Sequence, residues 1–133
     1  MPTGELMDLR LEVAAAAPSP NELRRRYRHW AAYKRLREDW EQRLFLAVPG
    51  RQRRAWLRMV VEKRPRVRVE VTVFRKRPLD PDNLTGSLKP VLDGMKNLGL
   101  IVDDSKEWIE LGPTKQERAR GMREATVIEL EEI

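Results

Sequence analysis

The stretch VRVEVTVFR at residues 67–75 decides the fold of this chain. Valine occupies every second position from 67 to 73, and polar residues stand between the valines. Successive side chains of a β-strand point to opposite faces, so this alternation predicts a strand with one buried face. Valine is also β-branched and favours strand geometry. It is the clearest strand in the sequence.

The segment before this strand predicts a second strand and a long helix. Apolar residues alternate with charged ones over 7–13, which indicates a half-buried strand. From residue 23 to residue 44 apolar side chains recur at steps of three and four, as in an amphipathic helix. Trp30 and Trp40 lie on that apolar stripe, and we expect both in the core. Residues 51–64 suit either a short helix or a strand, and we favour the helix.

The segment after the strand predicts a second main helix. An apolar stripe runs over 84–98 and ends at Asn97 and Gly99, which is typical of a helix terminus. Pro90 either kinks this helix or marks a fresh start with Ser87 as the N-cap. Short strands are expected over 108–111 and 125–130, joined by a polar connection over 112–121.

These elements predict a single α+β domain over residues 1–133. A small mixed sheet would be packed by two main helices, in the order β-α-β-α-β-β. The sequence has no cysteine and one histidine, His29, which excludes disulfides, thiolate metal sites and a pair of histidine ligands. No apolar run is long enough to span a bilayer, and the N-terminal residues lack the layout of a signal peptide. We therefore expect a cytoplasmic protein with no membrane partner.

Charge is distributed unevenly along the chain. Residues 21–77 carry 19 Lys or Arg against 6 Asp or Glu, whereas residues 78–133 carry 7 against 12. A basic segment of this strength is typical of proteins that bind polyanions. The acidic second half indicates a site that holds cations. Together they predict a nucleic-acid partner.

Two pairs of aspartates are candidates for that cation site. Asp80 and Asp82 follow the valine strand, and two side chains spaced by two share a face if strand geometry persists. Asp103 and Asp104 follow the second helix, and a chain returning beside the first strand could bring Asp104 to the first pair. Carboxylates without soft ligands favour Mg²⁺ or Mn²⁺ over zinc. Such a site in a basic protein predicts metal-assisted phosphodiester hydrolysis.

The same residues also suit a purely structural role. The sequence DPDN at 80–83 is an ordinary turn and helix N-cap, with Asp82 as the capping residue. Asp103 and Asp104 equally suit a polar turn after an apolar run. Residue types alone leave the two interpretations even.

Three segments carry a resemblance to a known family. LDPDNL at 79–84, KPVLD at 89–93 and GLIVDD at 99–104 resemble the motifs of the RusA-type Holliday junction resolvases. PSPN at 18–21, followed by an arginine-rich helix, is similar to the N-terminal segment of that family. The resemblance implies a RusA-like fold and a Mg²⁺-dependent homodimeric endonuclease that nicks four-way DNA junctions symmetrically.

The resemblance also implies roles for individual residues. Asp80, Asp82 and Asp104 would be the metal ligands, with Mn²⁺ as a substitute for Mg²⁺. Lys89 would be the essential lysine that stabilises charge on the attacked phosphate. Counted from Asp82, it lies three residues later than in the family, where this chain has Gly86. A three-residue step is nearly one helical turn, so the lysine can still reach the site along the same face.

Other residues have supporting roles in this hypothesis. Asp93 lies four residues after Lys89 and is expected to orient it through an ion pair. Trp108 is expected to pack in the core or at a dimer interface. Contacts with DNA phosphates are expected from two basic groups: Arg24, Arg25 and Arg28 on the first helix, and Arg75, Lys76 and Arg77 at the end of the valine strand.

Two other functions remain open at this stage. The chain could be a non-catalytic DNA-binding or architectural protein with a degenerate site. It could also be an RNA-associated protein in which the aspartates only cap helices. Cleavage of a four-way junction separates both from a nuclease.

Overall fold

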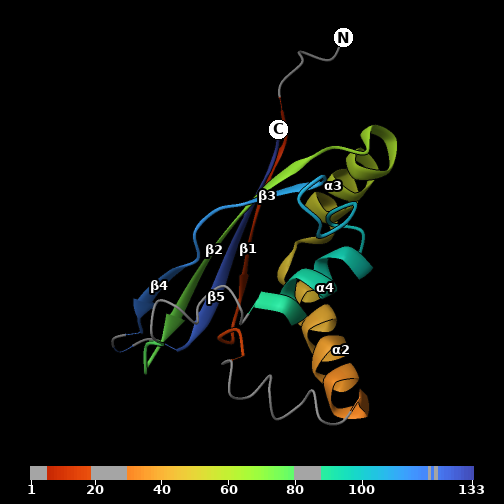
Figure 1. The fold of residues 1–133 in the computed structure, drawn as a ribbon. Helices are drawn as coiled ribbons and strands as arrows, with labels where there is room; N and C mark the ends of the chain where they lie inside the picture. The colour runs from red at the N-terminus through yellow and green to blue at the C-terminus, as the bar shows by residue number, and fades with distance from the viewer. Residues whose placement is uncertain (1–5, 19–29, 80–87, 120, 122) are drawn as a thin grey trace.

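The computed structural model describes residues 6–18, 30–79, 88–119, 121 and 123–133. Within these residues one mixed five-stranded sheet is covered by three helices, which confirms the predicted α+β class (Figure 1). The elements are, in chain order, β1 (Asp8–Val13), α2 (Trp30–Ala47), α3 (Gly50–Lys63), β2 (Val67–Arg75), α4 (Lys89–Asn97), β3 (Ile109–Leu111), β4 (Lys115–Arg118) and β5 (Ala125–Glu132).

The valine strand β2 lies in the middle of the sheet. β5 pairs with it antiparallel along one side, and β3 and β4 pair with it parallel, one after the other, along the other side. Among the described strands β1 pairs with β5 alone and forms one edge of the sheet. The four valines of β2 are at most 1% exposed. This confirms the strand that the alternation predicts.

All three helices pack against the same face of the sheet, which buries the valines (Figure 1). Trp40 and Leu44 of α2, Trp56 of α3 and Met95 of α4 are each at most 2% exposed in this core. The indole N–H of Trp56 donates to the carbonyl of Leu100 at 2.8 Å. The segment after residue 50, which suited either a helix or a strand, forms the helix α3, and this confirms the favoured prediction. Among the described residues no helix has the length and apolar character to cross a membrane.

Two predictions about the fold are wrong. Trp30 is 68% exposed rather than buried, because it lies at the first described turn of α2, which extends past the sheet (Figure 1). Its ring contacts Tyr33 and lies 5.9 Å from the Arg37 guanidinium. The polar connection after residue 112 contains a strand, β4, which pairs with Thr72–Arg75 of β2. Its sequence KQER has no apolar alternation, so the strand leaves no periodic signal.

The helix α4 is described from Lys89, with Leu88 before it and Pro90 in its first described turn. The residues that would distinguish a kink at Pro90 from a fresh start, 80–87, are not among those described. Ser87, the predicted N-cap, lies outside the described residues. Gly99 follows the helix with a φ of 79°, as expected of a glycine at a helix C-terminus. Gly94 lets α4 approach α2 closely, since an added Cβ would lie 3.0 Å from Leu44 Cδ1.

Candidate metal and DNA-binding site

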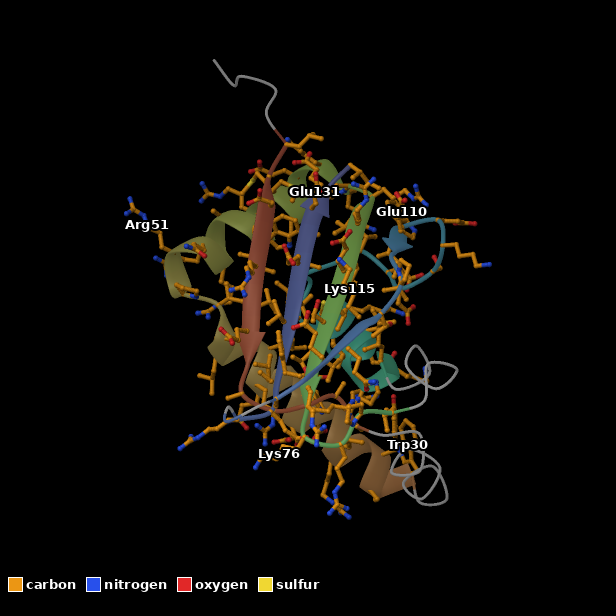
Figure 2. All side chains as sticks on the ribbon, turned by 90° about the vertical axis from the view of Figure 1, so that its left-hand side faces the viewer. Trp30, Arg51, Lys76, Glu110, Lys115 and Glu131 are labelled. Atoms are coloured by element: carbon orange, nitrogen blue, oxygen red, sulfur yellow. The ribbon has the colours of Figure 1, made fainter. Side chains whose placement is uncertain are left out.

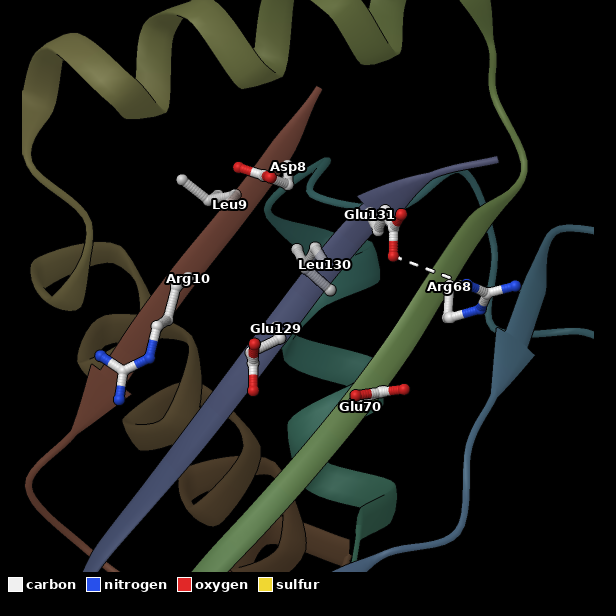
Figure 3. A pocket seen from close by; sticks show the side chains of 8 residues that line it. All are labelled: Asp8, Leu9, Arg10, Arg68, Glu70, Glu129, Leu130 and Glu131. Atoms are coloured by element: carbon white, nitrogen blue, oxygen red, sulfur yellow. Dashed lines mark ion pairs between the residues drawn. The ribbon is translucent and has the colours of Figure 1, made fainter. Parts of the chain in front are cut away.

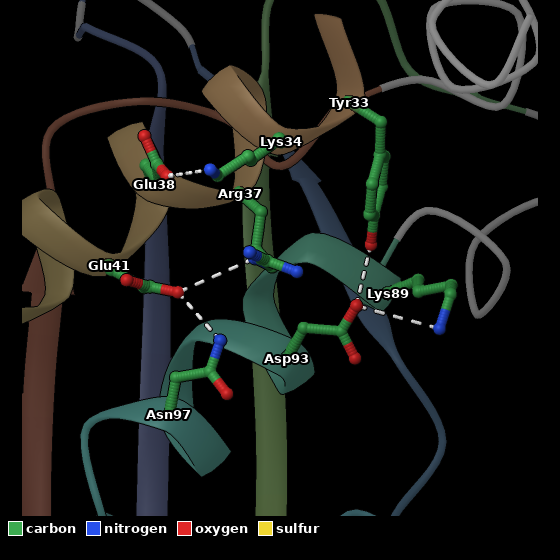
Figure 4. Close-up of polar contacts among 8 residues, drawn as sticks. All are labelled: Tyr33, Lys34, Arg37, Glu38, Glu41, Lys89, Asp93 and Asn97. Atoms are coloured by element: carbon green, nitrogen blue, oxygen red, sulfur yellow. Dashed lines mark hydrogen bonds and ion pairs between the residues drawn. The ribbon is translucent and has the colours of Figure 1, made fainter. Parts of the chain in front are cut away.

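A stripe of charged side chains runs along α4. Lys89, Asp93 and Lys96 are spaced by four and three residues, so they lie on one side of the helix. Lys89 Nζ lies 3.5 Å from Asp93 Oδ2, which confirms the predicted ion pair (Figure 4). Lys96 Nζ lies 3.0 Å from Asp103 Oδ1. One end of the stripe therefore carries the predicted lysine, and the other end contacts Asp103 of the predicted aspartate pair.

Burial of the segment after α4 brings the aspartate pair alongside this stripe. The chain turns at Gly99, and Leu100 and Ile101 are at most 2% exposed, which holds Asp103 and Asp104 close to the end of the helix. A hydrogen bond with Asp103, together with its charge, raises the pKa of Lys96, and Asp104 and Asp93 add smaller contributions. Lys96 is not among the site residues that the sequence predicted.

The two aspartates of the pair differ in their surroundings. The hydrogen bond from Lys96, followed by one from the backbone N–H of Asp104, lowers the pKa of the Asp103 carboxyl. Asp104 is half-buried and lines an open hollow together with Leu92 of α4 and Leu111 of β3. Because Lys96 already engages Asp103, Asp104 is the better candidate to bind a cation.

The donor atoms present suit a hard cation. Carboxylate oxygens are the ligands that Mg²⁺ and Mn²⁺ prefer, and two adjacent carboxyls repel each other unless a cation or a proton lies between them. Among the described residues no group of three Asp, Glu, His or Cys side chains comes close enough to hold a metal. Asp80 and Asp82, the other two predicted ligands, lie outside the described residues.

The strand that the sequence did not reveal holds the chain next to Asp80. The side chain of Gln116 in β4 makes two hydrogen bonds with the backbone of Leu79. Its Oε1 accepts from the Leu79 N–H at 2.8 Å, and its Nε2 donates to the Leu79 carbonyl at 2.9 Å. The residue before the first predicted ligand is therefore fixed to the sheet. A single glutamine in a polar run gives no sequence signal for this role.

The predicted phosphate contacts after β2 differ in exposure. Lys76 and Arg77 are exposed, whereas Arg75 shares the helix-facing side of β2 with the valines and is 6% exposed. Lys76 and Arg77 are thus the accessible cations of this group, and phosphate contact by Arg75 stays a prediction. Arg24, Arg25 and Arg28 lie outside the described residues.

The face of the sheet opposite the helices is acidic (Figure 2). The strand register places seven carboxylates and three cations on it. Arg68 lies between two of these carboxylates, 3.5 Å from Glu110 and 3.6 Å from Glu131. A shallow hollow on the same face is lined mainly by charged side chains (Figure 3). The acidic residues are Asp8, Glu12, Glu70, Glu110, Glu117, Glu129 and Glu131, and the basic ones are Arg10, Arg68 and Lys115.

Two features of the described chain were missed from the sequence. Exposed Arg51, Arg54 and Arg58 lie on α3, where their spacing of three and four residues was visible but was read only as part of the basic segment. Tyr33 of α2 donates a hydrogen bond to Asp93 at 2.6 Å. It lies on the apolar stripe of its helix, and nothing in the pattern distinguishes it from a core residue.

No family model matches this chain, and no curated protein matches it.

Proposed function

We propose that this chain is a Mg²⁺-dependent endodeoxyribonuclease that resolves four-way DNA junctions by symmetric nicking. The observation that carries the proposal is that Lys89 and Asp93 of α4 form an ion pair on the same side of the helix as Lys96, which contacts Asp103 at 3.0 Å. Lys89, Asp93 and Asp103 belong to the last two family-like motifs, and the first half of the chain is strongly basic.

The proposed chemistry divides among a few side chains. Asp104, together with Asp80 and Asp82, would hold the cation. A bound Mg²⁺, or Mn²⁺ in its place, would activate water and polarise the phosphoryl oxygen for in-line displacement. Lys89 has a side chain that is 53% exposed, so its ammonium group can reach a phosphate oxygen and stabilise the charge that develops there.

We propose that DNA avoids the open face of the sheet and contacts exposed cations outside that face. The excess of carboxylates on the open face repels phosphates. Exposed cations lie instead on α3 and after β2, at Arg51, Arg54, Arg58, Lys76 and Arg77. Arg24, Arg25 and Arg28 would add to this surface.

The salt dependence of junction binding tests that surface. About six phosphate contacts give a slope of log K against log salt of roughly −5. Replacing Arg54 and Arg58 together by Gln should reduce the slope by about 2, because each neutralised phosphate contributes about 0.9. Lys115→Gln on the open face is the matched control and should leave the slope unchanged. A nearly flat salt dependence of the native protein would refute an electrostatic interface.

Two symmetric nicks need two sites related by a two-fold axis, and a homodimer supplies them. We therefore propose that the active form is a homodimer. Sedimentation at the concentrations used for cleavage measures this directly, and paired nicking by a pure monomer would contradict it.

Cleavage of a synthetic four-way junction tests the proposed activity. With Mg²⁺ we expect paired, symmetric nicks in the junction, little cleavage of linear duplex or single-stranded DNA, and none with EDTA. Equal cleavage of all three DNAs would support a nuclease activity and contradict its specificity for junctions. Tight junction binding without cleavage would favour the architectural protein, and a preference for RNA over DNA would favour the RNA-associated protein.

A further inference from the structure

A buried tyrosine holds the carboxylate that pairs with Lys89. The Tyr33 hydroxyl donates to Asp93 Oδ2 at 2.6 Å, and the same oxygen lies 3.5 Å from Lys89 Nζ (Figure 4). Tyr33 comes from α2 and lies 60 residues away in sequence. The three side chains therefore form a chain of contacts from the core to the surface.

The exposure of the three groups decreases from the surface inward. The Lys89 side chain is 53% exposed and that of Asp93 is 19% exposed, while Tyr33 is 3% exposed. An exposed ion pair within one helix holds a lysine loosely, because water competes and both side chains are flexible. A hydrogen bond of 2.6 Å from a hydroxyl to a carboxylate is short and charge-assisted. It fixes the orientation of Asp93 from a rigid, buried side.

We propose that Tyr33 is a positioning residue for Lys89. Through Asp93 it fixes the lysine ammonium, so that the packing of α2 against α4 sets the place of this cation in the site. This inference rests on the proposed function, in which Lys89 contacts the attacked phosphate. It assigns a role to a residue that touches neither DNA nor metal.

A second hydrogen bond joins the same two helices and provides a matched control. Asn97 Nδ2 donates to Glu41 Oε1 at 2.7 Å, and Arg37 lies 3.6 Å from the same oxygen (Figure 4). Asn97 lies two turns along α4 from Lys89. If the tyrosine only stabilises the helix pair, breaking either bond should have the same effect.

The experiment compares single-turnover cleavage of a four-way junction by four variants. Tyr33→Phe removes only the hydroxyl and should slow cleavage by between about 10-fold and 100-fold, with junction affinity unchanged. Asp93→Asn should slow it at least as much, and the double variant should be no slower than Asp93→Asn, because Tyr33 acts through Asp93. Asn97→Ala should cleave at the native rate. Equal slowing by Tyr33→Phe and Asn97→Ala would overturn the proposal.

The mobility of the Lys89 side chain gives a readout that does not depend on activity. NMR relaxation of the Lys89 Cε carbon should show that this side chain is more ordered in the native protein and in Asn97→Ala than in Tyr33→Phe. If the Lys89 side chain loses order in Tyr33→Phe while the native protein cleaves no DNA, the positioning role of Tyr33 is supported and the proposed nuclease activity is refuted. If Tyr33→Phe cleaves the junction at the native rate and its Lys89 side chain is as ordered as in the native protein, the positioning role is refuted, whereas the proposed nuclease activity is not.

Discussion

Asp104→Asn should reduce Mg²⁺-dependent cleavage by more than about 100-fold. Replacing a group that merely orients a metal ligand costs 10-fold to 100-fold, so removing a ligand's charge should cost more. The substitution keeps the size of the side chain, and it removes one negative charge that repels phosphates. Junction affinity should therefore be retained or raised, and thermal stability without metal should be unchanged or higher. Asp82→Asn should behave in the same way.

The neighbouring aspartate provides the control for this variant. Lys96 binds the Asp103 carboxylate at 3.0 Å, so Asp103→Asn should lose an exposed ion pair and little activity. Cleavage rates and junction affinities of the two variants, measured side by side, separate a ligand from a polar turn. Full activity in both Asp82→Asn and Asp104→Asn would mean that the metal site is misassigned. A capping role for Asp82 predicts that result, since Asn caps a helix about as well as Asp.

Trp56→Ala should lower the free energy of unfolding by about 3–5 kcal/mol. The indole is 1% exposed and packs between α3 and the sheet, so its removal leaves a large cavity. The substitution also deprives the carbonyl of Leu100 of the N–H that donates to it at 2.8 Å. Leu100 begins the segment that leads to Asp103 and Asp104. We therefore expect a loss of ordered site geometry along with the loss of stability, both measurable in urea titrations and cleavage assays.

Trp30→Ala is the matched tryptophan control. Its side chain is 68% exposed, and substitutions at such positions usually change stability by less than about 0.5 kcal/mol. A cost at Trp30 as large as that at Trp56 would show that the first described turn of α2 is covered in solution, for example by a second copy of the chain.

Periodicity predicted the parts of the fold whose apolar residues face a core. The valine strand combines a strong period with burial and is confirmed, and so is the described part of the α2 stripe from Tyr33 to Leu44. Trp30 shows the limit of this reasoning, because helical spacing fixes the direction of a side chain but not whether the sheet extends far enough to cover it. β4 shows another limit, since a strand held by backbone pairing and polar contacts needs no apolar residue.

The candidate site was predictable only where residues lie close in sequence. The Lys89–Asp93 pair follows from helical spacing and is confirmed. Tyr33 and Gln116 act on residues 60 and 37 positions away, and such contacts depend on the packing of whole elements. Lys96 lies seven residues before Asp103, and the turn at Gly99 between them decides that they meet. The placement of Asp80 and Asp82 lies outside the described residues, and their role as ligands stays a prediction.

Binding of Mn²⁺ followed by nuclear magnetic resonance tests most directly whether a divalent cation binds at Asp104. Substoichiometric Mn²⁺ should broaden the amide signals of Asp104 and its neighbours first, and Asp104→Asn should abolish this broadening. The acidic open face, with Glu129 and Glu131, is the competing site in the same spectrum. Broadening centred on Glu129 and Glu131, with the signal of Asp104 unaffected, would contradict the metal site and the nuclease that depends on it.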